Sequence, residues 1–349
     1  MKRTLVLTTA VVLLAVAVPL GMIISAQSHK PGARRAPDIK AGDYTLSGPY
    51  THRNLTIFLI HGKDLGSGAT PLTLQEALEQ KKVVVYETKD VNELSIENLS
   101  NEDVYVQSGD IVKGGQQDRM IAVDLIVPPR SGKMPLAAFC VESGRWTRRG
   151  NEQAGSFSSS VNVASTKDIK LAAKRSNSQG DVWKNVAVAQ DKLSENVGTR
   201  VNSTVSESSL ELAVENRQVQ QTSESYLKAL SGIFNGSEDV IGYAFAINGE
   251  MNSADVYSSN ALFKKLWPKL LKANAIEAIA ELQKDKKSDQ ATAEHVKTFL
   301  AEGQNGIGAE KEVTARVRLF TREDEKNIFF ETRDRSQKGA WIHRNYIRK

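Results

Sequence analysis

The sequence predicts an α+β fold with an antiparallel β-sandwich or barrel-like core, a helical segment and C-terminal strands. Short runs rich in β-forming residues, separated by turn residues, fill residues 83–141 and favour such a core. Apolar residues at helical spacing follow between residues 179 and 301, and strand-like runs return after residue 313. Together these patterns predict one sheet-rich body with helices inserted in its second half.

The composition is that of a folded globular protein. Of the 349 residues, 40% are hydrophobic and 25% charged, so the chain can bury a substantial core. The formal net charge is +5, of which Lys2 and Arg3 supply two charges. Acidic residues are interspersed along the rest of the chain, so the excess is too diluted for a nucleic-acid-binding surface. We therefore expect no nucleic-acid partner.

Residues 1–26 are predicted to be an N-terminal membrane anchor or a signal peptide. Lys2 and Arg3 precede the uncharged stretch Leu5–Ile24, which is long enough to cross a bilayer as a helix. Ala26 offers a cleavage position, but Ile24 stands where a small residue is needed, which favours an uncleaved transmembrane helix. In that case the membrane is a partner through this segment, whereas cleavage would make the protein secreted.

The polar segment 27–45 contains Pro and Gly and is predicted to be a flexible tether. It would connect the N-terminal segment to a single domain over residues 46–349. The signal-like order of these features places that domain outside the cytoplasm, in the periplasm or at the cell surface.

The first strand is predicted at Leu55–Ile60 and ends at Gly62. Thr73 and Glu76 have the spacing of a capping box, which predicts a short helix ending near Lys81. Five further strands are expected at Val83–Tyr86, Val91–Ile96, Val104–Gln107, Ile121–Val127 and Leu136–Val141. The breaker Pro128–Gly132 is predicted to join the last two as a hairpin.

The second half mixes helices and hairpins. Residues 147–180 predict a long loop, and two helices are expected around a Ser/Thr-rich turn at 198–208. Asn248-Gly249 predicts a type I′ hairpin between Val240–Ile247 and a strand ending at Tyr257. Further helices are expected at Leu262–Leu271, where Pro268 should kink the helix or start a new one, and at Ala291–Ala301. The last strands are predicted at Val313–Phe320, Ile328–Thr332 and Ala340–Ile347.

Cys140 is the only cysteine, so no intramolecular disulfide can form. It lies within the apolar run Leu136–Val141 and has no recognisable base in a shared motif. Free cysteines are commonly buried, so we expect Cys140 to be a core residue rather than a nucleophile.

Two polar blocks, residues 109–119 and 139–146, form the candidate site. Gly109 and Gly114 have the spacing of a phosphate loop, but Gly115 and Gln116 stand where Lys and Ser/Thr are required. This excludes a nucleotide hydrolase of that type. No paired His or Cys motif supports a transition metal and nothing matches a calcium loop, so neither a metal nor another cofactor is expected.

The residue types in these blocks suit recognition of a small anionic ligand. Arg119 and Arg145 offer bidentate donors for a carboxylate or phosphate, and Trp146 offers a stacking face. The predicted ligand-binding residues are Lys113, Gln116, Gln117, Asp118, Arg119, Arg145 and Trp146. With about equal weight, Asp110, Asp118 and Glu142 could instead pair with the arginines and simply fix the turns.

The leading hypothesis is a membrane-tethered, extracytoplasmic ligand-binding or scaffold module without catalysis, open to a protein partner. The alternative is a hydrolase acting on a nucleotide- or sugar-derived substrate with a carboxylate pair. Asp110 and Glu142 would then serve as general acid and base, which requires the two blocks to meet in space.

The chain resembles a bacterial family known as the ARG-and-Rhodanese-Phosphatase-superfamily-associated protein domain. The matching stretches follow in the expected order over most of residues 50–285: Pro71–Ala77, Gly109–Arg119, Phe139–Trp146, Gln179–Trp183 and Gly249–Leu271. The resemblance implies a single α+β domain and, at most, a nucleotide-derived ligand. It implies no catalytic residues.

Overall fold

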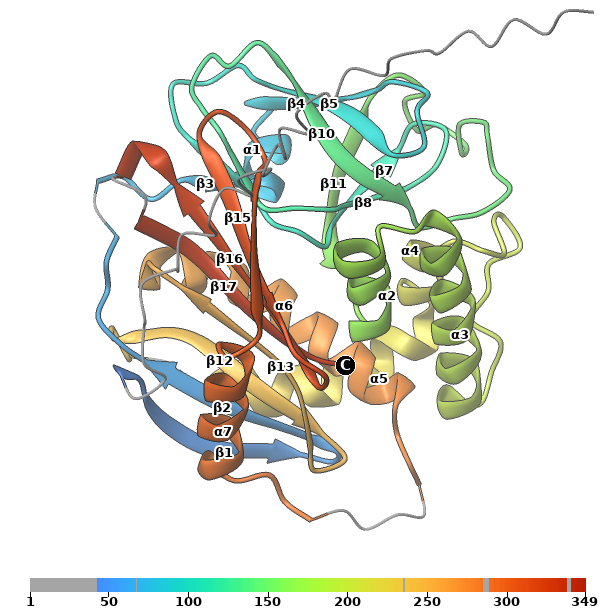
Figure 1. The fold of residues 1–349 in the computed structure, drawn as a ribbon. Helices are drawn as coiled ribbons and strands as arrows, with labels where there is room; N and C mark the ends of the chain where they lie inside the picture. Colours follow the sequence, from blue (N-terminus) through green and yellow to red (C-terminus); the bar gives the residue numbers. More distant parts are fainter. Residues whose placement is uncertain (1–42, 67, 235, 285–288, 338–339) are drawn as a thin grey trace, which may run out of the picture. The chain divides into compact units, whose positions relative to one another are not determined.

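The computed structural model describes residues 43–349 except 67, 235, 285–288 and 338–339 (Figure 1). The predicted anchor or signal peptide, residues 1–26, lies outside the described residues, as does the predicted tether up to residue 42. Thr45, the last residue assigned to the tether, already belongs to the first strand.

The prediction of a transmembrane helix is wrong as far as the described residues go. No helix among them is long and apolar enough to cross a membrane. The longest, α6 (Asn260–Ala280), has 21 residues but carries four lysines and packs inside the protein. The stretch from which the transmembrane helix was predicted, Leu5–Ile24, lies outside the described residues.

The largest sheet has eight strands, each antiparallel to its neighbours, in the order β1-β2-β12-β13-β17-β16-β15-β14. Its centre joins distant parts of the chain, because β2 pairs with β12 and β13 pairs with β17. Its strands are β1 (Thr45–His52), β2 (Leu55–His61), β12 (Val240–Ile247), β13 (Glu250–Tyr257), β14 (Ile307–Glu312), β15 (Val317–Glu323), β16 (Asn327–Asp334) and β17 (Ala340–Arg348).

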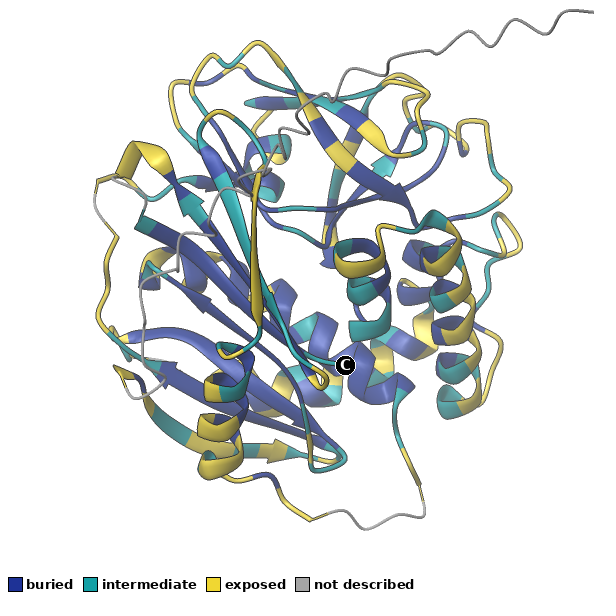
Figure 2. Cartoon of the chain, in the orientation of Figure 1, coloured by how far each residue is buried: buried dark blue, intermediate teal, exposed yellow. Residues whose placement is uncertain are grey.

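Both faces of this sheet are covered at its centre, whereas the edge strand β14 is exposed. In β2, Leu55, Ile57 and Leu59 belong to the core on one face, and Phe58 and Ile60 to the core on the other, as the two-residue period of a strand requires. The first core also contains α3, α5 and α6, and the second contains α7. Figure 2 accordingly shows the central strands and α6 as buried, whereas α7 exposes one side.

A second sheet of six strands and a small third sheet complete the β structure. Their orders are β11-β7-β8-β10-β5-β4 and β3-β6-β9, and only β3 and β6 run parallel to each other. Their strands are β3 (Leu72–Thr73), β4 (Val83–Glu87), β5 (Glu93–Asn98), β6 (Val104–Val106), β7 (Asp110–Gly114), β8 (Arg119–Ile121), β9 (Leu125–Val127), β10 (Lys133–Cys140) and β11 (Phe157–Val163).

The helices begin at side-chain caps, as their sequences predict. Thr73 and Glu76 form the expected capping box, and Ser259 caps α6 through the Leu262 amide. The helices are α1 (Leu74–Glu79), α2 (Lys167–Leu171), α3 (Gln179–Val197), α4 (Leu210–Val214), α5 (Arg217–Leu230), α6 and α7 (Ala293–Gly303). A π-helical turn, η2 (Ala172–Ser176), follows α2 directly, and a 3₁₀ turn, η3 (Arg335–Gln337), precedes β17.

The predicted α+β class with C-terminal strands is confirmed. The type I′ hairpin is confirmed too: β12 and β13 pair through Asn248 and Gly249, whose φ angles are 52° and 82°. Cys140 is fully buried, as expected of a core residue.

Three local predictions differ from the structure. The run Ile121–Val127 is divided between β8 and β9, which belong to different sheets, so Pro128–Gly132 joins no hairpin. The expected loop over 147–180 contains β11, which pairs with β7, and α2. Of the two outcomes expected at Pro268, the start of a new helix is wrong, because Pro268 lies within α6, which continues to Ala280.

Candidate functional site

The two polar blocks meet at Asp118 and Glu142. Antiparallel pairing of β8 with β10 sets Arg119 opposite Cys140, which brings the residues just before β8 beside those just after β10. The Asp118 amide donates to Glu142 Oε2 (3.2 Å), and the Val141 amide donates to the Asp118 carbonyl (3.1 Å). Both carboxylates are fully buried.

Two arginines neutralise these carboxylates. Arg145 contacts both oxygens of Glu142, at 2.8 and 2.7 Å, and Arg149 donates to both oxygens of Asp118, at 2.9 and 3.1 Å. Burial raises the pKa of Asp118 above its usual value despite Arg149. Burial acts in the same direction on Glu142, but the hydrogen bond and charge of Arg145 outweigh it and lower the pKa of that carboxyl. The four groups form a closed network.

Asp110 belongs to a different cluster. It forms an ion pair with Lys269 of α6 and accepts a hydrogen bond from the Gln107 amide. Asp110 begins β7, whereas the amide of Gly114, at its other end, donates to Asp118. Four residues of strand span about 13 Å. Asp110 and Glu142 therefore have separate cationic partners and do not form one carboxylate pair.

Arg119 also has internal partners, through its two terminal nitrogens. Its guanidinium is fully buried and donates to the Val91 carbonyl (2.8 Å), to Cys140 Sγ (2.9 Å) and to Glu87 (3.3 Å). Burial raises the pKa of the Cys140 thiol to about 11 in spite of this arginine. Cys140 is therefore held as an unreactive thiol.

The remaining predicted residues lie apart. Lys113 pairs with Glu215 (2.6 Å), and the Gln116 amide donates to Glu87 (3.1 Å). Gln117 is buried without a side-chain hydrogen bond to any described residue, whereas Trp146 is 45% exposed. Because the arginines are already paired, this geometry favours the alternative in which they fix the turns. Ligand binding at these residues stays a prediction.

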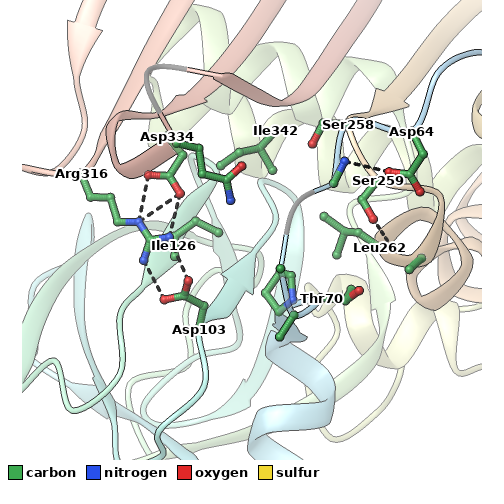
Figure 3. A pocket seen from close by; sticks show the side chains of 16 residues that line it. Asp64, Thr70, Asp103, Ile126, Ser258, Ser259, Leu262, Arg316, Asp334 and Ile342 are labelled. Atoms are coloured by element: carbon green, nitrogen blue, oxygen red, sulfur yellow. Dashed lines mark hydrogen bonds and ion pairs between the residues drawn. The ribbon is translucent and has the colours of Figure 1, made fainter.

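A cavity lies elsewhere, lined by the β13–α6 turn, by residues of the β3-β6-β9 sheet and by the residues just before β15 and at the end of β16 (Figure 3). Its volume is about 200 Å³. Its lining residues come from far apart in the sequence: Asp64, Gly66, Gly68, Ala69, Thr70, Pro71, Asp103, Ile126, Ser258, Ser259, Ala261, Leu262, Arg316, Asp334, Gln337 and Ile342.

Arg316 forms one wall of this pocket by joining two carboxylates. Its guanidinium donates to both oxygens of Asp103, at 2.6 and 2.8 Å, and to Asp334 at 2.7 to 3.1 Å, as Figure 3 shows. These bonds raise the pKa of Arg316, with the hydrogen bond to Asp334 contributing most. All three guanidinium nitrogens are used, so Arg316 acts as a rigid frame and not as a free donor.

The opposite wall is built at the start of α6. Asp64 accepts hydrogen bonds from the amides of Gly66 (2.8 Å) and Asn260 (3.2 Å), which fixes the loop after β2 against the helix. Ser258, Thr70 and Gln337 also line the pocket, and their side chains form no hydrogen bond with any described residue. These three groups can bind a ligand without breaking an existing contact.

Sequence reasoning missed this pocket. Ser259 lies just before the helix predicted at Leu262–Leu271, and Arg316 and Asp334 lie in or beside the strands predicted at Val313–Phe320 and Ile328–Thr332. The glycine-rich loop at residues 62–68 was the one local signal, because closely spaced glycines beside Asp64 are typical of a loop that approaches a ligand.

Among the described residues, no group of three or more His, Cys, Asp or Glu side chains is placed to hold a metal ion. The structure thus describes an α+β protein with mostly antiparallel sheets, an internal ion-pair network and a polar pocket of about 200 Å³.

The chain belongs to the ARG and Rhodanese-Phosphatase-superfamily-associated Protein domain family, which matches residues 43–347. The match confirms the family that the sequence motifs indicated and extends it to nearly the whole described chain. No curated protein and no solved structure matches the chain.

Proposed function

We propose that this protein is a binding module for a small polar molecule, which occupies the pocket of Figure 3. The observation that carries the proposal is a 200 Å³ pocket with three polar side chains, Thr70, Ser258 and Gln337, that have no partner among the described residues. Thr70 and Ser258 are partly buried and Gln337 is exposed, so all three groups are accessible to a ligand that enters the cavity. A concave pocket with a few convergent polar groups is typical of a ligand-binding site.

The volume limits the ligand to a small molecule or to one end of a larger one. At about 30 Å³ per water, the pocket holds roughly seven waters. Pockets for drug-sized ligands are usually larger, from about 300 Å³ upward. A ligand of roughly seven to twelve non-hydrogen atoms would displace this water.

The charges around the pocket favour a neutral or cationic ligand. Among the described lining residues, the carboxylates of Asp64, Asp103 and Asp334 outnumber the one cation, Arg316, which disfavours an anionic ligand. The apolar side chains of Ile126, Leu262 and Ile342 offer a surface for carbon atoms. Polyols and small amines carry the required combination of hydroxyl or ammonium groups and short carbon chains.

Among the described residues that line the pocket there is no His, Lys or Cys, which are common partners of an activated nucleophile. This supports binding over catalysis. The separate pairing of Asp110 with Lys269 and of Glu142 with Arg145 argues against the hydrolase alternative, which needs the two carboxylates together.

Calorimetric titration with small polyols, amines and carboxylates tests the proposal. We expect at least one polyol or amine to bind and carboxylates not to bind. A Thr70→Val/Ser258→Ala variant should weaken binding at least tenfold, whereas Thr204→Val, at an exposed loop position, should not. Binding that is unchanged in the double variant, or carboxylate binding alone, would contradict this assignment of the pocket.

Two further expectations remain predictions. One is that residues 46–349 lie outside the cytoplasm, which protease accessibility in intact cells would test. The other is that the module also contacts a protein partner.

A further inference from the structure

Three neighbouring strands of the large sheet bring a serine, a histidine and an aspartate into one hydrogen-bonded chain. Ser47 lies in β1, His61 ends β2, and Asp239 directly precedes β12. The strand order β1-β2-β12 makes β2 the middle strand, so His61 has a neighbouring strand on each side. Ser47 Oγ lies 2.7 Å from His61 Nε2, and His61 Nδ1 lies 3.0 Å from Asp239 Oδ1.

Backbone pairing fixes both contacts. Ser47 pairs with Leu59, which is two residues before His61 in β2. Residues two apart on a strand share a face, and so do residues paired across strands, so the Ser47 and His61 side chains point to the same face of the sheet. On the other side of β2, the Gly62 amide donates to the Asp239 carbonyl (2.9 Å). The three residues are thus positioned by the hydrogen-bond ladder of the sheet.

The directions of the hydrogen bonds suit a general base. A carboxylate only accepts hydrogen bonds, so Asp239 holds the ring proton on Nδ1 of His61. The other ring nitrogen, Nε2, then accepts the hydroxyl proton of Ser47. The hydrogen bond from His61 is the main reason why the pKa of Asp239 lies below its usual value, so this carboxylate is charged at neutral pH. Nucleophile, base and orienting carboxylate have the arrangement of a serine hydrolase triad.

A β-bulge in β1 adds a fourth group. Ser47 pairs with Leu59. Tyr50 pairs with Ile57, so β1 advances three residues where β2 advances two. The extra residue puts Ser47 and Tyr50 on the same face, although they are an odd number of residues apart. Tyr50 Oη donates to Ser47 Oγ at 3.4 Å. A hydroxyl donor beside the nucleophile is placed to stabilise the negative oxygen that forms on an attacked carbonyl group.

The nucleophile can be reached from solvent. Ser47 and His61 are partly exposed, and Gly48 and Pro49, which follow Ser47, are exposed. A carbonyl group of a small molecule can therefore approach Ser47 Oγ from outside the protein.

The chain also contains a serine–histidine pair that lacks the carboxylate. His52 Nε2 lies 3.3 Å from Ser225 Oγ, but Nδ1 of His52 forms no hydrogen bond with any described residue. This pair has a nucleophile and a ring nitrogen without an orienting group, so it is a matched control for the three residues around His61.

We propose that Ser47, His61 and Asp239 form a catalytic triad that hydrolyses small carboxylic esters. Ser47 Oγ bonds to the ester carbonyl carbon as its proton passes to His61 Nε2, and Tyr50 donates to the oxyanion. The carbon–oxygen bond to the alcohol then breaks, and His61 gives the proton to the departing alcohol. Water, deprotonated by His61, next attacks the acyl-serine, which releases the carboxylic acid and restores the Ser47 hydroxyl.

Esters fit this site better than amides. An alcohol leaves more readily than an amine, and the Asp239 side chain is 65% exposed, so solvent weakens its support of His61. None of the four residues lines the pocket of Figure 3, so this proposal and the ligand-binding proposal can fail separately.

A fluorophosphonate probe tests the triad on the wild-type protein. It reacts with an activated serine by forming an Oγ–P bond and releasing fluoride, and peptide mass spectrometry locates the modified residue. We expect modification at Ser47 and not at Ser225. His61→Gln should slow the reaction about a hundredfold or more, whereas His52→Gln should not change its rate. An unmodified Ser47 in the wild-type protein, or an unchanged rate in correctly folded His61→Gln protein, would overturn the proposal.

Hydrolysis of 4-nitrophenyl acetate provides a second readout. Ser47→Ala should remove most of the hydrolysis, and Ser225→Ala should not change it. Asp239→Asn should lower kcat about tenfold and leave KM unchanged, because this carboxylate orients the ring and does not touch the ester. Asp239→Glu should restore part of the loss. A hydrolysis rate that is the same in the wild type and in Ser47→Ala would also overturn the proposal.

Discussion

The backbone amide of Asp118 donates a hydrogen bond to Glu142 Oε2 at 3.2 Å, so two fully buried carboxylates lie side by side. Such a pair is tolerated only where cations compensate it, and here Arg145 and Arg149 do so. This contact gives the two polar blocks of the sequence a structural role, since it joins the start of β8 to the end of β10.

Arg149→Ala should destabilise the protein by about 3–5 kcal/mol, because it leaves Asp118 buried without its main cation. Urea denaturation measures this loss. The exposed pair Arg175–Glu323 provides the control, and Arg175→Ala should cost no more than about 1 kcal/mol. Combining Arg149→Met with Asp118→Asn should recover part of the loss. Equal, small effects of both arginine variants would contradict the structural role.

Stability should fall as the pH rises from 6.5 to 9, because of His343. Burial by itself would lower the pKa of this histidine, but Asp124 and Asp255 outweigh it and raise the pKa from 6.5 to about 9. The stabilisation is complete below pH 6.5 and is lost through pH 9, by roughly 3 kcal/mol. Lys174, whose pKa burial lowers, acts in the opposite direction.

Urea denaturation of His343→Gln beside the wild type isolates the histidine contribution. The variant should be less stable at pH 6, and its stability should not fall between pH 6.5 and 9. Parallel pH profiles of the two proteins would show that His343 is not protonated in the folded state.

Glu211 should produce a separate loss between pH 4.5 and 7. Burial, assisted by Glu215, raises the pKa of this carboxyl from 4.5 to about 7. The folded protein therefore holds the proton more tightly, so stability is greatest below pH 4.5 and falls by roughly 3 kcal/mol through pH 7. Glu211→Gln should match the wild type at pH 4.5 and exceed its stability at pH 8, as measured by urea denaturation. A variant that is less stable at pH 8 would contradict this.

Cys140 should not react with a thiol reagent in the folded protein at pH 8, because the side chain is buried and burial raises its pKa to about 11. One thiol should react at once in denaturing guanidinium. Rapid labelling of the native protein would return Cys140 to consideration as a nucleophile.

Much of the fold could be predicted because local signals agreed with tertiary structure. The Thr73–Glu76 capping box and the Asn248-Gly249 turn are short-range patterns, and both are confirmed. By contrast, β11 (Phe157–Val163) contains three serines and an asparagine and is held by its pairing with β7, which no local pattern reveals. Periodicity also gave no sign that β8 and β9 enter different sheets.

The sites were harder to predict than the fold. Residue types alone could not show that Arg119 and Arg145 are already paired, because Arg119 finds Glu87 only through the sheet. The pocket escaped notice for the same reason, since it joins Asp64 to Ile342 across most of the chain.

The central claim is that the pocket framed by Asp64, Ser258 and Arg316 binds a small polar molecule. Crystals soaked separately with small polyols, amines and carboxylates test it most directly. We predict density for a polyol or amine in contact with Thr70 and Ser258, and none for the carboxylates at this place. Fragments that bind only elsewhere, leaving this pocket filled with water alone, would contradict the claim.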